Sequence, residues 1–159
     1  MTKRTDWQNY FFKFAELASE RSTCTRRSVG AVLVKENMVI ATGYNGPPRG
    51  VPHCDEVGGC TRDQQSIPSG QRHELCRGLH AEQNAICQAA KLGIVIDGAT
   101  IYCRMTPCRV CAMLIINCGI KRVVCEMKYH DGNESEKMFK QADVLIDYIK
   151  DEILTYDKQ

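Results

Sequence analysis

Four residues in two short segments have the types and the spacing of a metal site that carries out chemistry. His80 lies two positions before Glu82 in the segment HAE, and Cys108 and Cys111 are three positions apart in PCRVC. Residues at i and i+3 share one face of a helix, and a helix N-terminus favours the thiolate form of cysteine, which binds metal. One histidine and two cysteines would leave the fourth position of a tetrahedral zinc ion open to water, as in catalytic zinc sites.

Glu82 is placed to move protons beside these candidate ligands. Zinc lowers the pKa of a bound water to about 7, and the hydroxide formed could attack a ring carbon that carries an amino group. Glu82 would take the proton of the water, pass it to the ring nitrogen and then protonate the leaving amine. Each feature alone is weak, but His-x-Glu followed by Pro-Cys-x-x-Cys is the signature of zinc-dependent nucleobase deaminases.

Alternating helices and strands are expected to position these residues. The turn at Glu36 and Asn37 predicts an antiparallel hairpin, Thr5 with Gln8 predicts a capping box, and Thr106 is expected to cap the helix that carries the two cysteines. This order predicts an α/β domain with helices on both faces of a mixed sheet. The predicted helices cover residues 6–21, 79–93, 106–120 and 134–142, and the predicted strands cover residues 29–35, 38–44, 98–105, 121–127 and 144–149.

The composition is that of a globular protein with a nearly neutral charge. The 159 residues are 43% hydrophobic and 25% charged, with a net charge of +2, which predicts one domain over residues 1–159 and no nucleic-acid or membrane partner. No segment resembles a signal peptide or approaches the roughly 18 apolar residues of a membrane span, so a cytoplasmic location is expected. In a reducing compartment the ten cysteines are expected to bind metal, to react or to be buried.

A long segment without periodicity separates the hairpin from the helix that follows His80. It covers residues 45–78 and is rich in glycine, proline and polar residues, with several cysteines and histidines among them. Loops of this length are uncommon inside compact domains and usually have a function. We therefore expect this loop to contribute to binding.

The segments TGYNGPPRG, HCDEVGGC, RHELCRGLHAEQNAI and TPCRVC together resemble the deoxycytidylate (dCMP) deaminase family, in its microbial, cysteine-rich form. The resemblance implies a three-layer α/β/α fold of the cytidine-deaminase type, with a five-stranded mixed sheet. It implies a zinc-dependent hydrolase that converts dCMP to dUMP plus ammonia and so supplies dUMP for thymidylate synthesis. It also implies a homohexamer that dCTP activates and dTTP inhibits.

The same resemblance assigns the substrate contacts. Asn45 would contact the sugar, the backbone of Ala81 would contact the pyrimidine, and Tyr129 would line the nucleotide pocket. The 5′-phosphate needs cationic or amide donors, and Arg26 and Arg49 are the candidates.

A second, structural zinc is also implied by the resemblance. Its matching positions are Cys24, Cys54 and His73. Structural zinc sites are usually closed by four protein ligands, so Cys76 is expected as the fourth, with Cys60 as a close competitor. Such a site would give order to the long loop, because metal binding contributes directly to folding.

Three other functions compete with this hypothesis. They are a tRNA adenosine deaminase, a deaminase of free cytidine nucleosides, and a non-catalytic zinc protein associated with DNA uptake. The small net charge argues against tRNA, and His80 in place of a cysteine argues against the nucleoside enzymes. Glu82 argues against a non-catalytic role, because a purely structural site does not use a neighbouring acid.

Overall fold

A mixed sheet of five strands forms the centre of the molecule in the computed structural model, which describes residues 4–154. Its strand order is β2-β1-β3-β4-β5, where β1 is antiparallel to both its neighbours and β3, β4 and β5 are parallel. This arrangement confirms the predicted mixed sheet and the antiparallel hairpin. The strands are β1 Gly30–Lys35, β2 Met38–Tyr44, β3 Thr100–Met105, β4 Arg122–Tyr129 and β5 Leu145–Tyr148.

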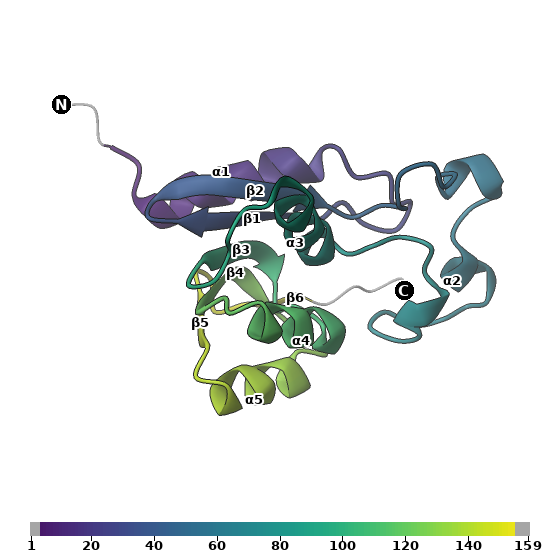
Figure 1. The fold of residues 1–159 in the computed structure, drawn as a ribbon. Coiled ribbons are helices and arrows are strands. Elements are labelled where there is room, and N and C mark those ends of the chain that lie inside the picture. Colours follow the sequence, from purple (N-terminus) through teal and green to yellow (C-terminus); the bar gives the residue numbers. More distant parts are fainter. Residues whose placement is uncertain (1–3, 155–159) are drawn as a thin grey trace.

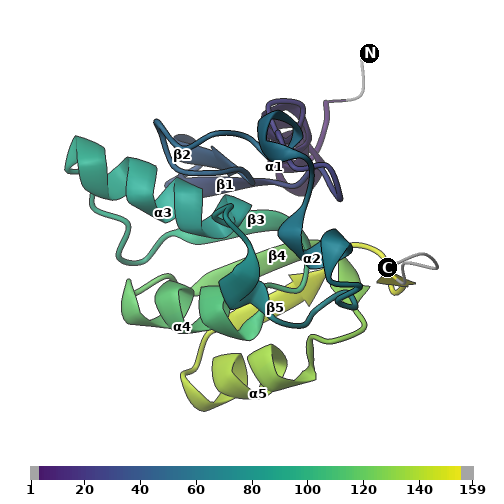
Figure 2. The ribbon, with the colours of Figure 1, turned by 90° about the vertical axis from the view of Figure 1, so that its right-hand side faces the viewer.

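Helices cover both faces of this sheet, as predicted (Figure 1). Helix α1 (Trp7–Ser19) packs with Val32 and Val124 on one face, whereas three helices pack with Leu33 and Val123 on the other. The alternation follows from strand geometry, since successive side chains point to opposite faces. The three helices on the second face are α3 Ala81–Leu92, α4 Arg109–Asn117 and α5 Asn133–Gln141, and Figure 2 shows them on the side of the sheet away from α1.

A very short sixth strand was not predicted. Strand β6 (Ile153–Leu154) pairs in parallel with the end of β4, where Lys128 is opposite Ile153. Two residues are too few to produce an alternating pattern, so the sequence carries no signal for this strand. Within residues 4–154, no helix is both long enough and apolar enough to cross a membrane.

Two predicted helix caps are wrong. Asp6, and not Thr5, caps α1, where its side chain accepts a hydrogen bond from the Asn9 amide at 3.0 Å. Thr106 does not cap α4, which begins two residues later than expected, with Cys108 at the N-cap position.

The buried hydroxyl of Thr106 instead joins the ends of two strands. It accepts a hydrogen bond from the Tyr129 amide at 3.1 Å and lies 2.9 Å from the Tyr148 hydroxyl. This long-range use of the hydroxyl explains why the local capping rule failed there. Cys108 takes the N-cap position of α4 without a side-chain capping hydrogen bond.

The long loop is anchored at its two ends. Gly46 and Leu79 form an isolated antiparallel bridge with hydrogen bonds of 3.1 and 2.8 Å, so the chain returns to the point where it left the sheet. Between these residues lie only short helical pieces: Asp55–Val57, α2 (Thr61–Gln64) and His73–Leu75. The loop projects from the end of the domain at which α3 begins (Figure 1).

Strand β2 and helix α3 approach each other unusually closely. A Cβ atom on Gly43 would lie 2.1 Å from the Ala81 carbonyl oxygen and 2.4 Å from the Ala85 nitrogen. Only glycine permits this approach, because every other residue would force the backbone of α3 away. The first turn of α3, which carries His80 and Glu82, is therefore held directly against the sheet.

Candidate metal centre and active site

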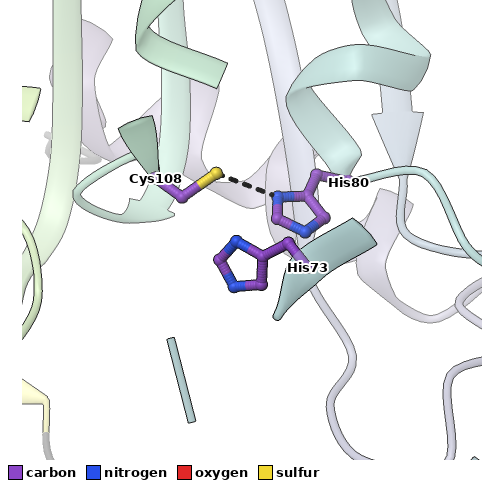
Figure 3. A group of neighbouring side chains, drawn as sticks. All are labelled: His73, His80 and Cys108. Atoms are coloured by element: carbon purple, nitrogen blue, oxygen red, sulfur yellow. Dashed lines mark hydrogen bonds between the residues drawn. The ribbon is translucent and has the colours of Figure 1, made fainter. Parts of the chain in front are cut away.

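Two helix N-termini bring the predicted metal ligands together. His80 is the N-cap residue of α3, Cys108 is the N-cap residue of α4, and Cys111 lies in the first turn of α4. The Nδ1 atom of His80 is 3.4 Å from the Sγ atom of Cys108 and also 3.4 Å from that of Cys111. Figure 3 shows the contact between His80 and Cys108.

These distances fit a zinc ion. A tetrahedral centre with Zn–N of about 2.0 Å and Zn–S of about 2.3 Å has N to S separations of roughly 3.5 Å. Both separations in the structure agree with this value. His80, Cys108 and Cys111 are three donors of the types that zinc prefers, and a tetrahedral ion held by them would keep a fourth position for another ligand.

The carboxyl group of Glu82 lies beside the predicted ligands in a buried position. Its side chain is only 5% exposed, and the thiol of Cys111 donates a hydrogen bond to its Oε2 atom at 3.6 Å. Burial raises the pKa of Glu82, although the nearby His80 acts in the opposite direction. A carboxyl group with a raised pKa can both accept and return a proton near neutral pH.

The two thiols of the cluster differ in acidity. The hydrogen bond from Cys111 lowers the pKa of Cys108 far below its ordinary value, and it raises the pKa of Cys111. Burial alone would lower the pKa of His80. The contacts of His80 with Cys108 outweigh this effect, so the pKa of His80 is raised. Cys108 is thus readily available as a thiolate, and a bound cation would be needed to stabilise Cys111 as a second one.

His73, the predicted ligand of a second metal, lies next to this cluster and lines the same pocket as the cysteines predicted with it. Its ring packs edge to face against His80, with 4.9 Å between the ring centroids (Figure 3). Within residues 4–154, two groups of side chains have ligand atoms all within 4.8 Å of one another, and neither includes a loop cysteine. These groups are His73, His80 and Cys108, and His80, Glu82 and Cys111.

A pocket extends from the metal cluster to the long loop. His80, Ala81 and Glu82 line it at one end, together with Cys108. Asn45 also lines it, and its side chain is held in place because it accepts from the Val29 amide at 2.8 Å and donates to a backbone carbonyl at 2.8 Å. Of the predicted substrate contacts, the pocket contains Arg26, Asn45, Ala81 and Tyr129, whereas Arg49 is exposed and lies outside it.

Arginine side chains gather in the wall of the same pocket, around Tyr129. The side chain of Arg26 is 6% exposed and pairs with Asp63 at 3.1 Å. The guanidinium of Arg27 contacts the face of the Tyr129 ring at 5.8 Å, and its Nη2 atom donates to the Ser69 hydroxyl. That hydroxyl in turn lies 2.7 Å from the Tyr129 hydroxyl.

Arg62 is the member of this cluster that sequence reasoning missed. It is 8% exposed, donates to the Pro68 carbonyl at 3.2 Å, and has a buried Nε atom without a hydrogen-bond partner in the structure. Burial and the neighbouring charge of Arg26 lower the pKa of Arg62. A cation held in this way is stabilised when an anion enters the pocket. The aperiodic loop gave no signal that would place Arg62 near Arg26.

Four cysteines also line this pocket: Cys24, Cys54, Cys60 and Cys76. Cys54 and Cys60 are buried, and Cys24 and Cys76 are partly buried. Burial raises the pKa of Cys54, and the charges of the other three raise it further, so all four lie in one electrostatic neighbourhood. The structure thus brings Cys24 together with the three loop cysteines, Cys54, Cys60 and Cys76.

The α/β/α layers, the His-Cys-Cys donor set and the buried glutamate define the class of zinc-dependent deaminases. The family model for the cytidine and deoxycytidylate deaminase zinc-binding region matches residues 5–127, and the chain belongs to this family. The class predicted from the two short motifs is therefore confirmed.

Two named proteins are similar to this chain over most of its length. The chain is 41% identical over 141 residues to a deoxycytidylate deaminase of Schizosaccharomyces pombe, a match that covers 89% of this chain but only 43% of that protein. It is 37% identical to ComE operon protein 2 of Bacillus subtilis, over 93% of this chain and 74% of the relative. The chain thus spans less than half the length of the fungal relative.

A solved structure is similar over nearly its whole length. The crystal structure of dCMP deaminase from the cyanophage S-TIM5 in complex with dCMP and dUMP has a TM-score of 0.75 and 30% sequence identity to this chain. The match covers 92% of this chain and 99% of that chain. This agreement confirms the cytidine-deaminase-type fold.

We expect the variants His80→Ala and Cys108→Ser each to contain about one zinc ion fewer per chain than the wild type, because each loses one of three protein donors. Metal analysis by mass spectrometry after gel filtration measures this loss. His130→Ala is the matched control, since His130 is exposed and belongs to neither compact group. Wild-type zinc content in His80→Ala would contradict the assignment.

Proposed function

We propose that this protein is a zinc-dependent dCMP deaminase, which converts dCMP and water to dUMP and ammonia. The observation that carries the proposal is a single pocket that has His80, Cys108 and the buried Glu82 at one end, with Cys111 next to His80, and a cluster of arginines in its wall. The end with the metal ligands and Glu82 suits the deamination of a base, and the wall with the arginines suits the binding of a phosphate. The named relative and the phage complex support this substrate.

Each residue of the metal end has a defined task. Zinc, when bound by His80, Cys108 and Cys111, supplies the Lewis acidity that makes water a nucleophile near neutral pH. Glu82 would take one proton from the attacking water and transfer it to the ring nitrogen. It would then take the remaining proton from the hydroxyl group added to the ring carbon and deliver it to the departing amine. Its burial keeps these transfers away from bulk solvent. The amino group leaves as ammonia, and the ring carbon keeps a carbonyl oxygen.

The rest of the pocket would orient the nucleotide. Ala81 lies between the ligand His80 and the acid Glu82, so its backbone can contact the pyrimidine. Asn45 would contact the sugar, and its rigid hydrogen bonds would fix that contact. Tyr129 would line the nucleotide site, where its hydroxyl is held by Ser69. Arg26 and Arg62 would receive the 5′-phosphate.

We also propose that a second zinc binds between Cys24 and the three loop cysteines. The support is the shared neighbourhood of Cys24, Cys54, Cys60 and Cys76, which matches the four-thiolate ligand set of closed structural sites. The metal would draw the four sulfur atoms together. In this assignment Cys60 takes the place of His73, which lies with the catalytic cluster.

The resemblance further leads us to propose a cytoplasmic homohexamer that dCTP activates and dTTP inhibits, and that feeds thymidylate synthesis. Assembly is supported by an apolar stripe on α4, where Val110, Met113 and Leu114 are 38–41% exposed. Residues at this spacing form one helix face, and such faces commonly mark contacts between proteins.

Ammonia release from dCMP, CMP, dCTP and deoxycytidine, measured in parallel, tests the proposed activity, and we expect turnover of dCMP to dominate. Glu82→Gln keeps the shape of the side chain but cannot move protons, so we expect it to retain zinc and to lose about 10²- to 10⁴-fold in kcat. Full activity in Glu82→Gln would exclude the proposed mechanism. No release from any of the four compounds by zinc-loaded protein would exclude the proposed substrate.

Replacing Arg62 tests the phosphate assignment. We expect Arg62→Gln to lower kcat/KM for dCMP about 10- to 100-fold, as for the loss of one charged hydrogen-bonded contact, and to leave deoxycytidine turnover unchanged. Arg62→Lys preserves the charge and should retain part of the activity even if packing suffers. Arg49→Gln is the control, because Arg49 lies outside the pocket. Equal losses on dCMP and deoxycytidine would contradict a phosphate contact.

Zinc stoichiometry tests the second metal site. We expect about two zinc ions per wild-type chain and about one in Cys54→Ser or Cys60→Ser, together with a lower melting temperature, because a structural zinc contributes to folding. Cys87→Ser is the matched control, since Cys87 is exposed on α3. A wild-type content of one zinc per chain, all of it lost in His80→Ala, would show that the loop cysteines bind none.

A further inference from the structure

A chain of hydrogen bonds, which the proposed mechanism does not use, runs from helix α5 to the wall of the pocket. The Tyr148 hydroxyl donates to the Oε1 atom of Glu136 at 2.6 Å and lies 2.9 Å from the Oγ1 atom of Thr106. The Thr106 hydroxyl in turn accepts a hydrogen bond from the Tyr129 amide at 3.1 Å. Both Thr106 and Tyr129 line the pocket. The chain therefore connects a carboxylate on α5 with two residues of the pocket wall.

The carboxylate of Glu136 sets the direction of every hydrogen bond in this chain. A carboxylate only accepts, and each hydroxyl has one proton to donate. Because Tyr148 gives its proton to Glu136, it can only accept from Thr106. Thr106 therefore donates to Tyr148 and accepts from the Tyr129 amide. Burial and the hydrogen bond to Glu136 raise the pKa of Tyr148, so the phenol keeps its proton at neutral pH.

The start of α5 packs directly against the same residues. A Cβ atom on Gly132, the N-cap residue of α5, would lie 2.8 Å from the Cγ2 atom of Thr106. The Gly132 amide also donates to the Tyr129 carbonyl at 3.1 Å. The Nζ atom of Lys128 lies over the Tyr148 ring, 5.4 Å from its centroid. The start of α5 and this part of the pocket wall thus form one packed unit.

Tyr129 is the residue at which the chain of hydrogen bonds reaches the pocket. Its amide is held by Thr106, and its hydroxyl lies 2.7 Å from that of Ser69 in the long loop. The guanidinium of Arg27 contacts the face of its ring at 5.8 Å. The long loop thus supports the hydroxyl of Tyr129, whereas α5 and β5 support its backbone.

We propose that Tyr148, held by Glu136, is a positioning residue for the nucleotide site and acts through Thr106 on Tyr129. Neither Tyr148 nor Glu136 lines the pocket, so both act through other residues and contact no substrate. The chain fixes the wall against which the nucleotide lies, so it affects the binding of dCMP more than the chemical step. The proposal rests on the proposed dCMP deaminase activity.

Steady-state kinetics of Tyr148→Phe test this role, because the variant removes only the hydroxyl and keeps the ring. We expect the KM for dCMP to rise about 10-fold, the effect of leaving one buried hydroxyl without its partner, with kcat nearly unchanged. Glu136→Ala should give a similar rise. Glu136→Gln, whose amide oxygen can still accept from Tyr148, should restore most of the binding. All three variants should keep the zinc content of the wild type.

A double-variant cycle separates action through Tyr148 from a general loss of stability. If Glu136 acts only through Tyr148, the combination of Glu136→Ala with Tyr148→Phe should have the KM of Tyr148→Phe alone, and not the product of the two rises. Tyr10→Phe and Glu134→Gln are the matched controls, because both residues are exposed and lie outside the chain of hydrogen bonds. Both controls should keep the wild-type KM.

Hydrogen exchange of the Tyr129 amide, measured by nuclear magnetic resonance without nucleotide, tests the chain independently of activity. We expect this amide to exchange about 10-fold faster in Tyr148→Phe, because the Thr106 hydroxyl loses the partner that orients it. Tyr10→Phe should leave the exchange rate unchanged.

Three outcomes would overturn the proposal. An unchanged exchange rate of the Tyr129 amide in Tyr148→Phe would show that the hydrogen bonds are not coupled. A wild-type KM in Tyr148→Phe would show that they do not position the nucleotide site, and additive effects in the cycle would show that Glu136 acts by another route. Failure of the proposed function is a separate result, because it would show as the absence of dCMP turnover by the wild type.

Discussion

The meeting of two helix N-termini on one face of the sheet is the constraint on which the rest of the site depends. Helices α3 and α4 must pack so that the N-cap residues His80 and Cys108 come within 3.4 Å. The packing of α3 on β2 depends on Gly43, where any side chain would collide with the α3 backbone. A small displacement of either helix would separate the donors and abolish the zinc geometry.

Burial then determines what the residues around this meeting point can do. The carboxyl group of Glu82 is removed from water, which raises its pKa and suits it to proton transfer. Arg62 is also buried in the wall of the same pocket, where burial and the neighbouring charge of Arg26 lower its pKa. The pocket thus presents thiols, a carboxyl group and guanidinium groups to one small ligand, an arrangement that suits a nucleotide with an aminated base and a phosphate.

Local rules predicted the regular elements well and the helix ends less well. The hairpin followed from β-branched strands around Glu36 and Asn37, and both turn residues have the positive φ angles of a tight hairpin, 51° and 59°. The cap of α4 was predicted wrongly because the Thr106 hydroxyl bonds to residues more than twenty positions away. Local propensity cannot anticipate a partner that only the folded chain supplies.

The sequence by itself determined the order of elements, the class of chemistry and its central residues. His80, Glu82, Cys108 and Cys111 were readable because their spacing is local and repeats a known pattern. Only the tertiary structure decided how the long loop folds over the pocket. It placed His73 beside the catalytic ligands, gathered Cys60 with the other loop cysteines, and buried Arg62 beside Arg26. The physical reason is that a loop without periodicity takes its conformation from long-range contacts, which sequence spacing does not encode.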